Sequence, residues 1–170
     1  ARHLLPMENY IQAQEGHGPS SGRWTSILSS RGCPYGCTFC ESRRTAWIAR
    51  TPKDVVDEME YCLQEWGINE FHFEDDNMTI NKDRLIGICD EIISRKLNIK
   101  WQTPNGIRAS VTDVEMLTKM KESGCLHITL APETGSERVL KEIIEKGKDF
   151  DLTQLKDCGI LAHDLGLKVA

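Results

Sequence analysis

The sequence has no long apolar run, no excess of basic residues and no second group of clustered cysteines. Its 170 residues carry 21 Lys and Arg against 26 Asp and Glu, a formal net charge of −5. Nucleic-acid-binding proteins usually present a basic surface, so this charge argues against that class. No apolar stretch approaches the roughly 20 residues of a membrane span, and no secretory signal opens the chain. We therefore expect a cytoplasmic protein that contacts neither nucleic acid nor membrane.

Seven cysteines are present, and three of them stand close together. Cys33, Cys37 and Cys40 follow the spacing C-x3-C-x2-C, a run too short to span a packed core. Thiolates are soft ligands that bind iron–sulfur clusters, zinc or copper(I). Iron–sulfur clusters usually take four cysteines, and no fourth cysteine lies nearby. A cluster held by these three would keep one iron without a protein ligand, and open metal positions are where substrates bind.

Two other interpretations of this motif stay open. A zinc site could be completed by a distant histidine, although zinc sites commonly pair C-x2-C with a second such pair or with spaced histidines. A disulfide framework would leave one of the three sulfurs over, and nothing in the sequence indicates secretion. The iron–sulfur cluster is the favoured interpretation. The other four cysteines lie on apolar positions and are expected to be core thiols: Cys62, Cys89, Cys125 and Cys158.

The extended string from Ser30 to Cys40, SRGCPYGCTFC, resembles the signature of the radical S-adenosylmethionine (radical SAM) superfamily. It is most similar to the branch whose members often carry an upstream cobalamin-binding domain. The resemblance implies that Cys33, Cys37 and Cys40 hold a 4Fe-4S cluster and that the methionine part of SAM chelates the fourth iron. One electron, from a donor such as flavodoxin or ferredoxin, then cleaves SAM to a 5′-deoxyadenosyl radical that acts on a small-molecule substrate. Cobalamin, held by a domain outside this chain, is a further cofactor in that branch.

Helical and strand patterns alternate along the chain. Residues 1–22, rich in Gly, Ser and Pro towards their end, are interpreted as a linker or lead-in, and residues 23–170 as the core domain. Helices are predicted to begin at Thr51, Asn81 and Thr112, with further helical faces over 139–144 and 152–165. Strands are predicted at 24–30, around Phe71 and Phe73, at 99–103 and at 126–130, with the start of another at 167–170.

This alternation implies βαβ units and a parallel sheet. The resemblance implies an α/β fold of radical SAM type: a partial parallel (β/α) barrel with about four βα units of six, truncated at its C-terminus. The pattern by itself is equally consistent with a short doubly wound sheet. The chain begins at Ala1 rather than Met and stops where a strand pattern starts, so we expect an incomplete core domain.

Polar residues follow four strands in succession, and in parallel α/β folds ligands bind at the carboxyl ends of the strands. The resemblance places Asp75, Asp76 and Asn77 where much of the superfamily has Gly-Gly-Glu, which contacts the SAM amino group. It gives Glu133 a contact to the ribose and places the backbone of Phe39 near the adenine. The alternative for the acids is a helix N-cap and a solvated loop. Two further candidates follow the third strand, Asn105 and Arg108, of which an arginine can pair with a carboxylate.

The sequence thus predicts the core of a radical SAM enzyme acting on an unknown substrate, with cobalamin-dependent methyl transfer or cyclisation as options. No catalytic residue is assigned. The competing hypotheses are an iron–sulfur or zinc-binding module without SAM chemistry, and a fragment whose cysteines carry no metal.

Overall fold

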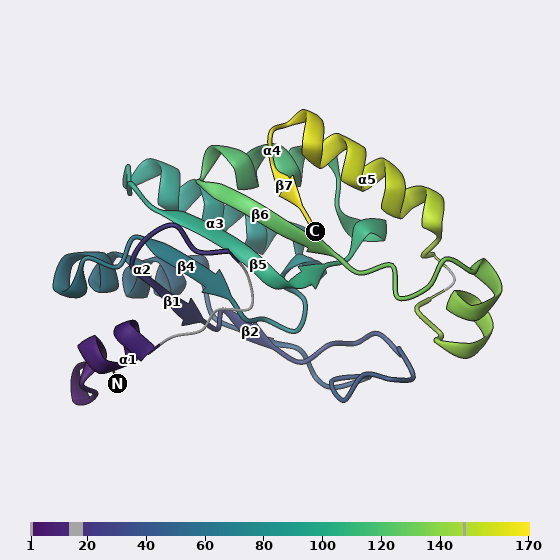
Figure 1. Cartoon of the computed structure of the whole chain (residues 1–170), viewed down its shortest axis with the longest axis horizontal. Coiled ribbons are helices and arrows are strands. Elements are labelled where there is room, and N and C mark those ends of the chain that lie inside the picture. Colours follow the sequence, from purple (N-terminus) through teal and green to yellow (C-terminus); the bar gives the residue numbers. More distant parts are fainter. Residues whose placement is uncertain (1, 14–18, 148) are drawn as a thin grey trace.

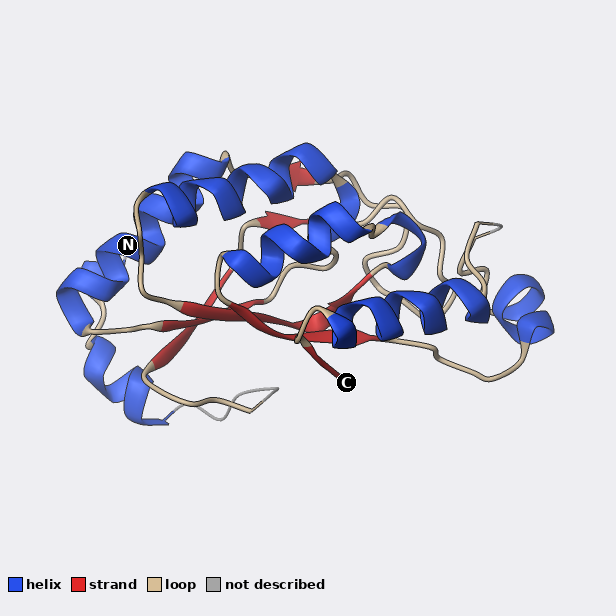
Figure 2. Cartoon of the chain, turned by 90° about the horizontal axis from the view of Figure 1, so that it is seen from above, coloured by secondary structure: helices blue, strands red, loops and turns tan. Residues whose placement is uncertain are grey.

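Five parallel strands form the central sheet of the computed structural model, which describes residues 2–13, 19–147 and 149–170 (Figure 1). The strands are β1 (Trp24–Ile27), β4 (Glu70–Phe73), β5 (Lys100–Ile107), β6 (Cys125–Leu130) and β7 (Lys168–Val169). Their order in the sheet is their order in the chain. Every crossover therefore moves in the same direction, and right-handed crossovers then place the connecting helices on one face (Figure 2). A doubly wound sheet would reverse direction, so that alternative is wrong and the partial (β/α) barrel is confirmed.

Four helices cover this face: α2 (Pro52–Trp66), α3 (Lys82–Ser94), α4 (Val114–Glu122) and α5 (Leu152–Asp164). The predicted caps of the first two are confirmed, because Thr51 and Asn81 each accept a hydrogen bond from the backbone N–H three residues later. The predicted cap of α4 is wrong by one residue. Asp113 accepts from the N–H of Met116, whereas the Thr112 hydroxyl donates to the carbonyl of Arg108 at 2.8 Å.

The apolar core lies between the sheet and these helices. Phe71 and Trp101 on the strands are fully buried, as are Val56, Leu85 and Leu117 on the helices. All four cysteines predicted to be core thiols are buried as well: Cys62, Cys89, Cys125 and Cys158. The body of the protein is therefore held together by apolar burial, which contributes about 25 cal/mol for each Å² removed from water.

The opposite face of the sheet carries polar side chains. Glu70 and His72 on β4 and Gln102 on β5 are 2% exposed or less, and they contact one another through hydrogen bonds. The segment that precedes β1 covers them, because Ser21 donates to Glu70 and the carbonyl of Pro19 accepts from Gln102. These contacts give Glu70 and Gln102 the partners that buried polar groups need, whereas the Nδ1 atom of His72 has no hydrogen-bond partner among the described residues.

The remaining elements correct the prediction in several places. The strand predicted over 24–30 is two strands, since β1 ends at Ile27 and β2 (Ser30–Arg31) pairs with β3 (Ile48–Ala49) in an antiparallel hairpin. The predicted helix over 139–144 is a π-helix, η4 (Val139–Ile143). Three 3-10 turns were not predicted: η1 (Arg2–Leu4), η2 (Met78–Ile80) and η3 (Ala109–Val111).

Within the predicted linker over 1–22, the described residues include η1 and the helix α1 (Met7–Ala13), whose Met7 is buried and belongs to the core cluster. Residues 14–18, which include part of the Gly-rich patch, lie outside the described residues, and the boundary at residue 22 stays a prediction. Among the helices that the structure describes, none is long and apolar enough to span a membrane.

Candidate metal centre

A cavity at the carboxyl ends of β4, β5 and β6 contains all three clustered cysteines. Its walls come from the loop after β2 and from the segments that follow β4, β5 and β6. The lining residues are Cys33, Tyr35, Cys37, Phe39, Cys40, Asp76, Asn77, Asn105, Gly106, Ile107, Arg108, Ala131, Glu133 and Lys146. Nine of the ten residues predicted for the site therefore lie together, and Asp75 does not line this cavity.

The three cysteines lie on residues 32–42, which we call the cysteine loop. This loop is the first part of the connection between the hairpin strands β2 and β3. All three are free thiols and half-buried. Among the described residues, no three His, Cys, Asp or Glu side chains stand close enough to enclose a single metal ion. A cluster of several irons takes its thiolates at different irons and not at one metal ion. The three soft donors share one cavity, and their chemistry fits such a cluster.

Charges near the thiols differ along the loop. Burial raises the pKa of Cys33, and the neighbouring Cys37, Cys40 and Asp76 raise it further, while a backbone hydrogen bond lowers it. Burial also raises the pKa of Cys37, against the opposing effect of Lys146 and then Arg108. Metal binding requires the thiolate form, so the two cations favour the ligating state of Cys37.

Two contacts hold the cysteine loop against the far side of the cavity. The N–H of Thr38 donates to the carbonyl of Ile144 at 2.8 Å, and its hydroxyl donates to the carbonyl of Ile143 at the end of η4. The guanidinium of Arg108 lies 3.8 Å from the centre of the Tyr35 ring, a cation–π contact. The chain around Cys37 is thus fastened to the segments after β5 and β6.

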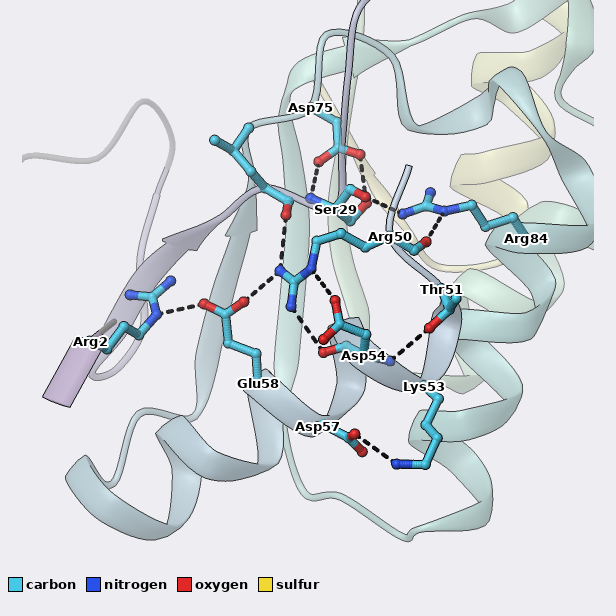
Figure 3. Close-up of polar contacts among 11 residues, drawn as sticks. Arg2, Ser29, Arg50, Thr51, Lys53, Asp54, Asp57, Glu58, Asp75 and Arg84 are labelled. Atoms are coloured by element: carbon cyan, nitrogen blue, oxygen red, sulfur yellow. Dashed lines mark hydrogen bonds and ion pairs between the residues drawn. The ribbon is translucent and has the colours of Figure 1, made fainter. Parts of the chain in front are cut away.

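Asp75 belongs to a buried polar network on the helix side (Figure 3). One carboxylate oxygen accepts from the N–H of Ser29 at 2.7 Å, and the other accepts from the hydroxyls of Ser29 and Ser30 at 2.6 and 2.5 Å. Arg84 donates to the carbonyls of Ser29 and Arg50 in the same network. Asp75 therefore fixes the turn between β1 and β2, and its carboxylate has three protein donors.

The next two residues have other partners. Asp76 accepts from the N–H of Gly32 at 2.6 Å and from the hydroxyl of Ser42 at 2.5 Å. Asn77 caps η2, because its side-chain oxygen accepts from the N–H and the hydroxyl of Thr79. Asn77 therefore has the N-cap role that the sequence left open as an alternative, and it also lines the cavity.

The candidates after β5 and β6 differ in exposure. Arg108 is 5% exposed and donates to the carbonyl of Lys146 at 2.5 Å and to Ser110 at 3.0 Å. Glu133 takes the left-handed conformation, with φ of 61°, and accepts from the ammonium of Lys146 at 3.0 Å. Phe39 is 59% exposed. The cavity thus presents acids, amides and cations at its rim.

Sequence reasoning missed Tyr35 and Lys146 as cavity residues. Tyr35 lies inside the recognised motif, so its position between Cys33 and Cys37 was a usable signal. Lys146 gave none. It follows η4, and its ammonium donates back to the carbonyl of Ala131 as well as to Glu133, a return of the chain that no local pattern encodes.

A singly wound parallel sheet with three free cysteines in one cavity at the strand carboxyl ends is the arrangement of a (β/α) barrel core that can hold a metal centre through thiolates. Residues 27–169 match the family model of the Radical SAM superfamily, and the chain belongs to that superfamily. The family predicted from the cysteine motif is therefore confirmed. Members of this superfamily are enzymes that use a 4Fe-4S cluster and SAM.

Two relatives show the extent of the similarity. The chain is 35% identical over 159 residues to the cytidylyl-2-hydroxyethylphosphonate methyltransferase of Streptomyces wedmorensis, covering 90% of this chain and 29% of that protein. It is 37% identical over 142 residues to the anaerobic magnesium-protoporphyrin IX monomethyl ester cyclase of Cereibacter sphaeroides, covering 79% of this chain and 22% of that protein. The chain therefore spans less than a third of the length of either relative.

Solved structures share the fold. The radical SAM methyltransferase TsrM from Kitasatospora setae, with tryptophan and a SAM analogue bound, superposes with a TM-score of 0.76 at 21% identity, covering 86% of this chain and 29% of that one. The cobalamin-dependent radical enzyme OxsB, with aqua-cobalamin bound, gives a TM-score of 0.71 at 23% identity, covering 85% and 23%. TsrM has also been solved with cobalamin and a [4Fe-4S] cluster bound.

Proposed function

We propose that this chain is the part of a radical SAM enzyme that binds the 4Fe-4S cluster and SAM. The observation that carries the proposal is the cavity that joins Cys33, Cys37 and Cys40 to polar side chains from three successive strand ends. When bound, the cluster supplies the single electron that cleaves SAM. The chain's own residues hold the cluster, orient SAM and shield the site.

The lining residues match the chemistry of SAM, which carries a sulfonium, an ammonium, a carboxylate and a ribose. Asp76, Asn77 and Asn105 offer oxygen acceptors for the ammonium and the hydroxyls. The cation of Arg108 is suited to the carboxylate, and Glu133 to the ribose. Phe39 offers its backbone to the adenine. Asp75 supports this site from behind, because its carboxylate is bonded to Ser29 and Ser30.

The substrate is proposed to be a small molecule that undergoes methyl transfer or cyclisation, as the names of the two relatives indicate for those proteins. We further propose flavodoxin or ferredoxin as the electron donor, and cobalamin as a cofactor bound outside these residues.

Anaerobic reconstitution with iron and sulfide tests the proposal. We expect a reduced cluster whose paramagnetic resonance spectrum changes when SAM is added. A cluster whose spectrum ignores SAM would indicate an electron-transfer module, and a protein that takes up zinc but no cluster would contradict the proposal.

A matched pair of variants locates the SAM contact. Asn105 lies in the cavity near the carboxyl end of β5, whereas Asn98 is exposed just before the amino end of the same strand. We expect Asn105→Ala to weaken the spectral response to SAM and Asn98→Ala to leave it unchanged, with equal iron content in both. Equal responses would remove Asn105 from the site.

A further inference from the structure

The three cysteines lie on a segment with little regular structure. Within the cysteine loop, residues 33–42 form turns and irregular backbone, and each residue is half-buried or exposed. Ordering such backbone costs roughly 1–2 kcal/mol of conformational entropy for each residue. A site for a rigid ligand is strongest when the protein has met this cost before the ligand arrives. A contact that restrains the loop without metal therefore favours cluster binding.

Asp76 contacts the cysteine loop at both of its ends. Gly32, which precedes the first cysteine, donates its N–H to one carboxylate oxygen at 2.6 Å. Ser42, which lies two residues after the last cysteine, donates its hydroxyl to the other oxygen at 2.5 Å. One side chain at the end of β4 thus bridges two positions that enclose all three ligands.

The backbone at Gly32, which donates this hydrogen bond, is tightly confined. Its φ is 87°, in the left-handed region, and a Cβ there would lie 2.1 Å from the carbonyl oxygen of Ala46. Only glycine fits this close approach. The hydrogen bonds are made to an ionised acceptor, which makes them about twice as strong as neutral ones. The restraint is therefore specific in position and strong for an exposed side chain.

We propose that Asp76 is a positioning residue that clamps the two ends of the cysteine loop and so presets the separation of the three thiols for the cluster. This inference rests on the proposed function, and it gives Asp76 a task in addition to the proposed contact with SAM. Among the described residues, Asp75, its neighbour, forms hydrogen bonds with Ser29 and Ser30 before the loop, so the two acids act on different segments.

The test measures how fast the reconstituted protein loses iron to a chelator under anaerobic conditions. Asp76→Ala removes both hydrogen bonds, Ser42→Ala removes one, and Ser42→Thr keeps the hydroxyl. We expect iron loss to be at least about tenfold faster in Asp76→Ala, clearly faster in Ser42→Ala and unchanged in Ser42→Thr, in keeping with the loss of hydrogen bonds to a charged group. Asp157→Asn, an exposed acid on α5, is the matched control and should match the wild type.

A double variant makes the test specific. Because the Ser42 hydroxyl acts through Asp76, Ser42→Ala should add nothing to the rate of Asp76→Ala. The melting temperature of the metal-free protein should stay unchanged, since the clamp orders the loop and not the core. Fully additive effects, or a fall in that melting temperature, would overturn the proposal.

Two results separate this inference from its rivals. If Asp76→Ala weakens the spectral response to SAM but loses iron at the wild-type rate, Asp76 is a SAM contact and the clamp is wrong. If the wild-type protein itself takes up no cluster, the proposed function fails before Asp76 is tested.

Discussion

The α/β body and the cysteine loop are held in opposite ways. The body buries Phe71, Trp101 and Leu117 completely between sheet and helices. The cysteine loop contributes no residue to that core, and Phe39 within it is 59% exposed. The loop is positioned instead by a few polar contacts from Asp76, Arg108 and the carbonyls after η4. Stability and site geometry are therefore separable properties of this protein, and they meet in the adjacent acids Asp75 and Asp76.

The largest expected effect is on the body. Phe71→Ala removes a fully buried ring from β4 and should lower the free energy of unfolding by about 3–5 kcal/mol. Phe39→Ala in the loop should change it by no more than about 0.5 kcal/mol. Denaturant unfolding of the metal-free protein measures both, and equal losses would mean that the loop is part of the cooperative core.

The junction between the two regions comes next. Asp75→Ala leaves the N–H of Ser29 and two buried hydroxyls without their acceptor. Unsatisfied buried donors cost about 1–3 kcal/mol, so the free energy of unfolding should fall by about that amount, measured by thermal and denaturant unfolding. Asp76→Ala is the companion variant. A comparable loss of stability there would erase the distinction drawn between the two acids.

A smaller, pH-dependent effect is expected at Glu58 in the body (Figure 3). Burial raises the pKa of Glu58, but hydrogen bonds and charges from Arg2 and Arg50 outweigh burial and hold it below its ordinary value of 4.5. The ionised form is favoured in the folded state, so its contribution is present above pH 4.5 and is lost as the pH falls through the folded pKa. Glu58→Gln should cost about 1 kcal/mol at pH 7. The difference in the free energy of unfolding between the wild type and Glu58→Gln should shrink in unfolding curves taken progressively below pH 4.5. A difference that does not change with pH would contradict the ion pairs.

The smallest change in stability is expected at the ligands. Cys37→Ala in the metal-free protein should alter the free energy of unfolding by no more than about 0.5 kcal/mol, because Cys37 packs in no core cluster. The same variant should lose the cluster, as measured by bound iron after reconstitution. Cys89→Ala, which alters a fully buried thiol on α3, is the contrasting control and should keep its iron. Full iron retention in Cys37→Ala would defeat the ligand assignment.

Local patterns were sufficient for most of the body. The two ends of α2 are as predicted: the helix begins after Thr51 with Pro52 and ends at Gly67. A cap hydroxyl, a fixed φ and a left-handed glycine each act within one turn, so a local pattern is enough to predict them. Prediction failed where distant residues decide. Ser30 and Arg31 leave the sheet because β3, seventeen residues further on, offers them an antiparallel partner. The helical face over 139–144 became a π-helix whose carbonyls serve the cysteine loop.

The sequence by itself determined the family and predicts the three cysteine ligands, because a C-x3-C-x2-C spacing with its flanking residues is a local signal. It could not divide the tasks among Asp75, Asp76 and Asn77, three polar neighbours with the same apparent role. Only the tertiary structure decided that one fixes the turn after β1, one bridges the cysteine loop and one caps η2. Hydrogen-bond partners at the end of a strand come from other strands and loops. Their identity is therefore set by how the sheet assembles and not by the order of residues along the chain.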